Sequence, residues 1–145
     1  MRILISNIIL AFILIACSSS ANNSADARKH SKFEIYFSAS PCFGKCKVYN
    51  INLKNNIMEL NAIENTPMLG EFSSEVTAEE LNMLWDIVEA NSIMSNLKEE
   101  AYGQDMTDLP YIEMRIKIDN KEKVIKYRNI VPESIKKIDS FLRST

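Results

Sequence analysis

Two closely spaced cysteines carry the side chains best suited to chemistry. Cys42 and Cys46 are separated by three residues, among them Lys45. Such a pair can form a structural disulfide, exchange disulfides with another protein, or bind a metal ion. Lys45 would lower a thiol pKa and so favours exchange, but the spacing departs from the C-x-x-C of thioredoxin-like motifs. A zinc site needs four ligands and the chain adds one histidine, His30, so we predict no metal and no other cofactor.

An acidic loop downstream is the second candidate for chemistry. Glu99, Glu100, Asp105 and Asp108 could supply oxygen ligands to calcium or hydrogen bonds to a sugar. Their spacing does not match an EF-hand, and a solvated connection is the simpler interpretation. With His30 as the one histidine, no Ser-His-Asp set is available, so acid–base chemistry would need carboxylates, lysines or tyrosines.

The first segment predicts export. Arg2 is the one charge before Cys17, and the apolar run at 8–15 is shorter than a membrane-spanning helix requires. Leu14-Ile15-Ala16-Cys17 resembles the lipobox of bacterial lipoproteins, which implies cleavage before Cys17 and its lipidation. Ser18 follows in place of an aspartate, which in such lipoproteins favours the periplasmic face of the outer membrane. The alternative is an uncleaved, short membrane anchor.

Lipidation of Cys17 also bears on the cysteine pair. It would leave Cys42 and Cys46 as an even pair in a compartment that permits disulfides. Gly44 is expected to let the short loop turn tightly enough for the sulfurs to meet. We therefore predict a structural disulfide, with redox activity as the alternative.

The composition indicates one small domain behind a linker. We assign residues 1–16 to a signal peptide, 17–31 to the lipidated cysteine and a flexible linker, and 32–145 to a single domain. The formal net charge of −2 argues against a nucleic-acid partner, which requires a basic face.

Hydrophobic periodicity predicts the elements that position these residues. Alternating apolar and polar side chains indicate strands at 33–38, 49–53, 58–62, 69–76, 112–118 and 124–128. Thr77 and Glu80 form a capping box at the start of a helix that fades near Asn91, and Pro132 opens a second helix. We predict an α+β domain: an antiparallel sheet of about five to six strands with two helices packed on one face and the other face wet.

Two motifs resemble those of a bacterial family of unknown function. Residues 40–49, Ser-Pro-Cys-Phe-Gly-Lys-Cys-Lys-Val-Tyr, resemble its S-P-C-F-G-x-C-P-x-Y signature, although Lys47 replaces the usual proline. Thr107-Asp108-Leu109-Pro110 resembles its T-D-x-P element before a strand. The resemblance runs from about Phe33 onward. It implies the architecture and frequent lipidation, but no established activity.

These observations predict a non-enzymatic, lipid-anchored binding domain of the cell envelope. The partners expected are the membrane, through the lipid on Cys17, and an envelope protein or polymer. The alternatives are a thiol–disulfide enzyme using Cys42 and Cys46 and an envelope hydrolase using the acidic loop. The candidate binding residues belong to the two motifs and the acidic loop: Pro41, Phe43, Gly44, Tyr49, Asp105, Thr107, Asp108 and Pro110.

Overall fold

A computed structural model describes residues 32–97, 101–103 and 108–144 of the chain. The described part is an α+β fold, as the periodicity predicted. Its elements are β1 (Phe33–Ala39), β2 (Val48–Lys54), β3 (Ile57–Glu64), β4 (Gly70–Glu75), α2 (Ala78–Ala90), α3 (Ile93–Asn96), β5 (Ala101–Tyr102), β6 (Ile112–Ile118), β7 (Lys121–Tyr127) and α4 (Glu133–Ser144).

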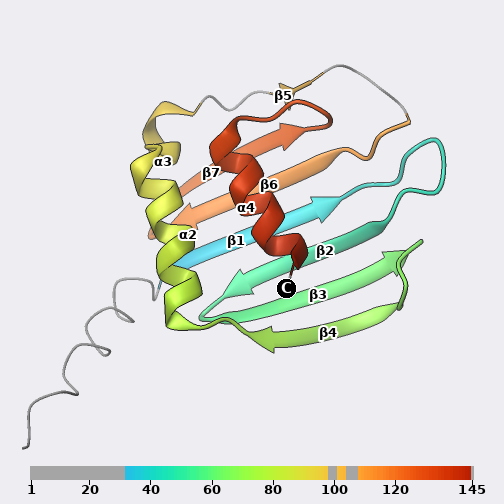
Figure 1. Ribbon diagram of the computed structural model, residues 1–145, viewed down its shortest axis with the longest axis horizontal. Coiled ribbons are helices and arrows are strands. Elements are labelled where there is room, and N and C mark those ends of the chain that lie inside the picture. The colour runs from blue at the N-terminus through green and yellow to red at the C-terminus, as the bar shows by residue number, and fades with distance from the viewer. Residues whose placement is uncertain (1–31, 98–100, 104–107, 145) are drawn as a thin grey trace, which may run out of the picture.

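The strands form one sheet in the order β4-β3-β2-β1-β6-β7-β5 (Figure 1). All pairs are antiparallel except the short parallel pair of β5 with β7. Tight turns join β2 to β3 and β6 to β7, and Asn55, Asn56 and Asp119 adopt the left-handed backbone there. Asparagine and aspartate tolerate this conformation better than most residues, so the turn signals in the sequence were informative.

The helices cover one face of the sheet. Leu84 and Val88 of α2 and Ile135, Ile138 and Leu142 of α4 are buried against it (Figure 1). Burying one such side chain contributes about 1.5–3 kcal/mol. Within the described residues, no helix is both long and apolar enough to cross a membrane.

The helix-facing side of β1 lies at the centre of this core. Phe33, Ile35, Phe37 and Ala39 are each at most 2 % exposed, and Trp85 of α2 contacts the Phe33 ring edge-on. Each partner strand contributes its own alternate residues to the same layer. The period of two in the sequence therefore identified the buried face correctly.

The capping box is confirmed. The Thr77 hydroxyl accepts a hydrogen bond from the Glu80 amide at 3.2 Å, and the Thr77 amide donates to the Glu80 carboxylate at 2.8 Å. These two bonds pair backbone donors that the first helical turn cannot pair internally. The Thr77 amide and the Thr77 hydroxyl, each 2.8 Å from the Glu80 carboxylate, hold the pKa of Glu80 below its ordinary value.

Three elements differ from the sequence prediction. The loop at 98–110 contains the two-residue strand β5, β7 begins at Lys121 instead of Val124, and a one-turn helix, α3, follows α2. The first residues of β7 read as polar because they lie near the edge of the sheet, where fewer apolar side chains are required. Pro132 precedes α4, and its carbonyl accepts from the amides of Ile135 and Lys136.

The opposite face of the sheet is exposed and charged, as predicted for Glu113, Arg115 and Lys117. Glu113 lies 2.6 Å from the Arg115 guanidinium and 3.4 Å from Lys126 Nζ. On the neighbouring strand, Glu34 lies 3.7 Å from Lys117 Nζ. Opposite charges on adjacent strands stabilise this pairing, each by a few tenths of a kcal/mol to about 1 kcal/mol.

Glu113→Gln should make the free energy of unfolding depend less on pH in the acid range. Burial alone raises the pKa of Glu113, but hydrogen bonds and the charges of Arg115 and Lys126 outweigh it and hold the pKa below 4.5. The unfolded chain then binds the proton more readily, so this stabilisation is present above pH 4.5 and is lost as the pH falls through the folded-state pKa.

Thermal unfolding followed by circular dichroism at a series of acid pH values measures this effect. Glu71→Gln, on exposed β4, is the matched control and should leave the profile as in the parent chain. An unchanged profile for Glu113→Gln would contradict the role of its ion pairs.

Candidate functional site

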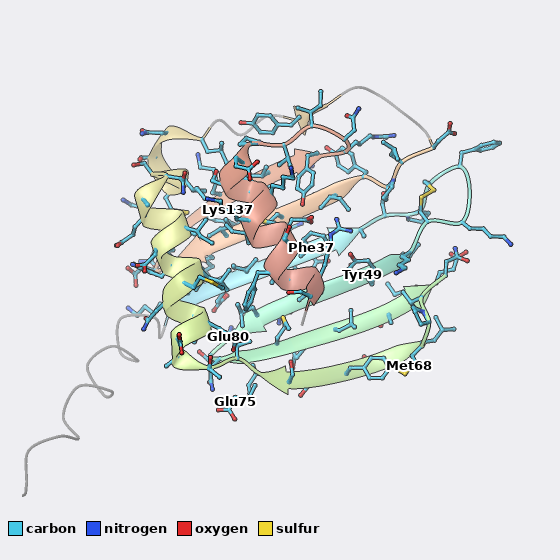
Figure 2. The ribbon with its side chains drawn as sticks, in the orientation of Figure 1. Phe37, Tyr49, Met68, Glu75, Glu80 and Lys137 are labelled. Carbon is cyan, nitrogen blue, oxygen red and sulfur yellow. A yellow bond between two sulfur atoms is a disulfide. The ribbon has the colours of Figure 1, made fainter. Side chains whose placement is uncertain are left out.

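Three segments distant in the sequence meet at one end of the sheet. We call this the loop end and define it as residues 40–47, 65–69 and 108–111. The antiparallel order places the end of β1 beside the starts of β2 and β6, and the β3–β4 turn lies at the same end (Figure 1). Figure 2 shows the disulfide here, with Met68 at the neighbouring turn.

Direct contacts bring the two motif segments together. The Ser40 amide donates to the Tyr111 carbonyl at 2.9 Å, and the Tyr111 amide donates to the Ser40 hydroxyl at 2.9 Å. Cys46 Sγ lies 3.7 Å from the Asp108 carbonyl oxygen. A sulfur in a disulfide has no hydrogen to donate, so this last contact is one of packing. The two motifs therefore form one surface.

The cysteine pair is joined as expected. Cys42 and Cys46 form a disulfide, with their Cα atoms 5.7 Å apart. The Gly44 amide donates to the Cys42 carbonyl at 2.9 Å and tightens the turn around Phe43. Asn65 Nδ2 donates to the Cys46 carbonyl at 3.0 Å and attaches the loop to the β3–β4 turn.

The expected requirement for glycine at position 44 is wrong. Gly44 is not among the residues with positive φ, and a Cβ built there would lie 3.7 Å from Cys42 Sγ, an ordinary contact. Gly70, at the start of β4, is the glycine near this end with a φ of +117°. The left-handed conformation that favours glycine therefore occurs at the β3–β4 turn.

The loop end presents apolar side chains to solvent. Phe43, at the tip of the disulfide loop, is 85 % exposed. Met68 and Leu69 in the β3–β4 turn are 65 % and 64 % exposed. Among the other candidate residues, Pro41 and Asp108 are exposed and Pro110 is half-buried. Since an exposed aromatic side chain on a tied loop contributes nothing to the core, it is available to a partner.

Tyr49 lies apart from this surface. It is 8 % exposed and its ring stacks on Phe37 at 5.8 Å. Figure 2 shows Phe37 and Tyr49 close to the C-terminal part of α4. Burial raises the pKa of the Tyr49 hydroxyl. Tyr49 therefore supports the loop from within the core.

A polar cluster that the sequence did not indicate attaches α4 to the sheet. Tyr127 donates to the Asp139 carboxylate at 2.7 Å, and Arg143 binds the same carboxylate through Nε and Nη2 at 2.8–2.9 Å. The Arg143 guanidinium also lies over the Phe37 ring, 5.1 Å from its centroid. The i,i+4 spacing of Asp139 and Arg143 was visible in the sequence, but the contribution of Tyr127 was not.

This cluster has a structural effect. Burial and the bond to Asp139 raise the pKa of Tyr127 well above its ordinary value, so its hydroxyl remains a donor at physiological pH. Burial lowers the pKa of Arg143, but the hydrogen bond to Asp139 and the charge of that carboxylate raise it by more. The pKa is therefore above its ordinary value, and the guanidinium stays charged. A charged guanidinium and a protonated tyrosine hydroxyl that both donate to Asp139 favour fixed hydrogen bonding over proton transfer.

The structure describes part of the acidic loop. Asp105, Thr107, Glu99, Glu100, Cys17 and His30 lie outside the described residues. Asp108 is exposed, with its backbone against Cys46. Across the described ranges, no three His, Cys, Asp or Glu side chains gather where they could hold a metal ion.

A wide hollow of about 720 Å³ lies at the opposite end of the sheet. Its lining includes Trp85, Met94 and Glu89 from the helices and Asp119 and Lys121 from the β6–β7 turn. Asp119 also pairs with Lys32 at 3.7 Å, just before β1. None of the motif residues that the structure describes lines this hollow, so it is separate from the loop end.

Most of the described residues fall within a family already defined by sequence. The chain belongs to the family described as a domain of unknown function (DUF6438), whose model matches residues 33–145. This confirms that the chain belongs to a family of unknown function and agrees with a resemblance beginning near Phe33. No curated protein matched the sequence.

Replacing both Cys42 and Cys46 with serine should lower the free energy of unfolding by about 2 kcal/mol. This is the low end of the range for disulfides because the closed loop is short. Urea unfolding of the two chains, followed by tryptophan fluorescence, measures the difference. Gly44→Ala is the matched control and should unfold as the parent does, since its Cβ has room. Unchanged stability of the serine variant would contradict a structural role for the disulfide.

Proposed function

We propose that this protein is a non-enzymatic binding module of the bacterial cell envelope, anchored by a lipid on Cys17, which engages an envelope protein through its loop end. The observation that carries this proposal is Phe43, 85 % exposed at the tip of a disulfide-closed loop. The motif of which Phe43 is part has no other aromatic side chain at the surface of the loop, since Tyr49 is buried.

The energetics of the loop end suit protein recognition. Burying a phenylalanine side chain on a partner contributes about 1.5–3 kcal/mol, and aromatic anchors dominate many interfaces. The disulfide and the bonds from Asn65 and Tyr111 already restrain the surrounding backbone. Binding therefore costs less conformational entropy than it would for a free loop.

The place where the chain enters the folded domain, just before β1, is compatible with an N-terminal anchor. Lys32 precedes β1 at the end opposite the loop end, since β1 runs from Phe33 to Ala39 between them. A lipid upstream of Lys32 would attach the domain from that side and leave Phe43 free. A flexible linker over residues 17–31 would reach on the order of 20 Å from the bilayer.

Thiol–disulfide exchange is the second candidate, because Cys42 and Cys46 are half-buried and not enclosed in the core. The two functions differ in the reduction potential of this bond. A structural bond has a potential below about −300 mV, whereas exchange enzymes have potentials of roughly −270 to −120 mV. Equilibration of the folded chain in glutathione buffers, followed by alkylation of free thiols, distinguishes the two.

Cys17→Ala should prevent processing and lipidation and release the protein from the lipoprotein pathway. Incorporation of labelled palmitate and fractionation of the membranes measure the effect. Ser18→Ala is the neighbouring control and should be lipidated as the parent is. Continued labelling of the Cys17→Ala chain would contradict lipidation at this residue.

A photo-reactive phenylalanine analogue at position 43 should cross-link the full chain to one discrete envelope protein in the producing cells. The same analogue at position 83 is the control, because Met83 is 46 % exposed on α2, away from the loop end. Phe43→Ala should reduce co-purification of the cross-linked protein by about tenfold or more, and Phe43→Trp should retain it. Equal cross-linking from both positions, or none, would overturn the proposal.

A further inference from the structure

The free edge of β4 is a second binding surface, distinct from the loop end. We propose that it binds an extended peptide of a partner protein as an additional strand, with basic and apolar side chains alternating along that peptide. β4 is the last strand of the sheet on its side, and all six of its residues are exposed. Exposed edges of this kind accept further strands. This inference does not depend on the function proposed for Phe43.

The edge lacks several of the usual devices that prevent strand addition, although Glu71 and Glu75 place charge on it. Within β4 there is no lysine, no proline and no register shift against β3, from Ile57 opposite Glu75 to Ala62 opposite Gly70. A six-residue strand also offers enough length for a stable peptide pairing. At the opposite edge of the sheet, by contrast, the short strand β5 pairs with β7, and Lys123 of β7 donates to the Leu97 carbonyl.

The hydrogen-bond pattern shows which backbone groups are available. The Val76 amide donates to the Asn56 carbonyl at 2.8 Å, so the backbone groups of Val76 point toward the β3 side of the hairpin. Directly bonded and non-bonded pairs alternate along an antiparallel ladder. Ser74 and Phe72 therefore bond to β3, whereas Glu71, Ser73 and Glu75 direct their N–H and C=O groups away from it. Three successive donor–acceptor sets thus face solvent along the edge.

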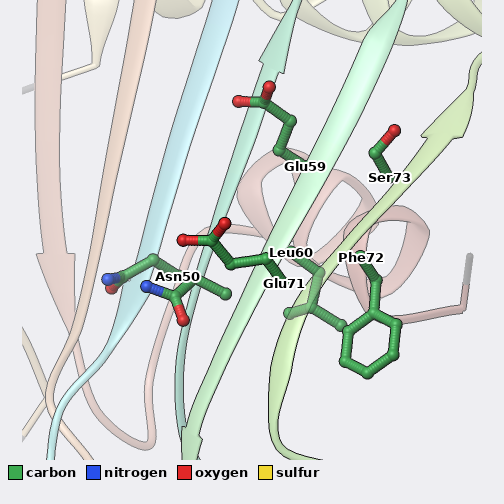
Figure 3. A pocket seen from close by; sticks show the side chains of 7 residues that line it. Asn50, Glu59, Leu60, Glu71, Phe72 and Ser73 are labelled. Atoms are coloured by element: carbon green, nitrogen blue, oxygen red, sulfur yellow. The ribbon is translucent and has the colours of Figure 1, made fainter.

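On the helix side, the edge presents the apolar side chain of Phe72 between Gly70 and Ser74. Phe72 is 38 % exposed and, with Leu60 and Leu142, lines a hollow of about 130 Å³. Figure 1 shows that α4 ends before it reaches β4, and Figure 3 shows Phe72 beside Leu60. An added strand would direct every second side chain to this side. Apolar side chains at those positions would cover Phe72.

On the other side, the edge is acidic. Glu59 and Glu71, with Asn50, Asn61 and Ser73, line a hollow of about 310 Å³, to which Leu60 and Phe72 also contribute (Figure 3). The chain from residue 57 to 76 contains four glutamates and no lysine or arginine. Cross-strand pairs of opposite charge are favourable and like charges are not. The side chains that an added strand presents here should therefore be lysine or arginine.

The charge also selects between a partner and a second copy of this chain. Pairing two β4 edges would bring together two hairpins that each carry four glutamates. The resulting repulsion opposes the dimer, whereas a basic peptide is attracted to the same edge. The occupant is therefore an extended basic segment of another protein.

The test uses the isotopically labelled full chain in a neutral detergent and an end-blocked six-residue peptide in which lysine and valine alternate. Amide shifts should concentrate on Glu71, Ser73 and Glu75. Ser73→Pro removes an outward amide and should weaken binding by about tenfold or more, while Ser73→Thr should bind as the parent does. Because the Ser73 amide does not bond to β3, the proline variant should fold, which its spectrum verifies.

A doubly substituted chain tests the proposal if the proline variant fails to fold. Glu71→Lys combined with Glu75→Lys should lose the lysine peptide and gain a peptide in which glutamate and valine alternate. Phe43→Ala should bind the lysine peptide unchanged, which separates this inference from the proposed function. Shifts elsewhere, equal binding of a backbone N-methylated lysine peptide, or unchanged affinity of either β4 variant would overturn the proposal. Concentration-dependent β4 shifts without peptide would identify a second copy as the occupant and overturn it as well.

Discussion

The pairing of β1 with β6 is the interaction on which the rest of the structure depends. Each residue of β1 lies opposite a residue of β6, and from Glu34 onward β1 also pairs with β2. This arrangement joins the hairpins of the first half of the chain to the hairpin of the second half. It also creates the buried layer under the helices, because alternate side chains of β1 face α2 and α4. Without it, each half would expose an apolar face that neither could cover alone.

The loop end follows from that long-range pairing. Ser40 bonds to Tyr111 because β1 and β6 meet there in register, and the same register brings Cys46 against Asp108. The disulfide closes only a short local loop, so it stiffens the tip without deciding where the tip lies. Position and rigidity therefore have different causes. The sheet positions the loop, and the covalent bond limits its motion.

Charge is distributed unevenly over the exposed face of the sheet. Glu34 and Glu113, near its centre, are paired with lysines on neighbouring strands, and Glu113 also pairs with Arg115 of its own strand. Residues 112–128 contain six basic and three acidic side chains, whereas residues 57–76 contain four acidic and no basic ones. Exposed charges farther apart than about 8 Å are largely screened at physiological ionic strength. The β3–β4 hairpin therefore presents a local negative potential, although the whole chain is close to neutral.

Local patterns in the sequence determined most of the secondary structure. A period of two identified the strands and their buried sides, and Thr77 with Glu80 marked the start of α2, because these signals depend on neighbours within a few residues. The tertiary structure decided the contacts between distant segments. It placed Tyr127 on Asp139 and buried Tyr49 away from the motif surface. It also gave Gly70, in the β3–β4 turn, the positive φ that favours glycine, whereas Gly44, in the disulfide loop, has no such φ. Strand order and register are set by the burial of the entire core, and no single stretch of sequence encodes them.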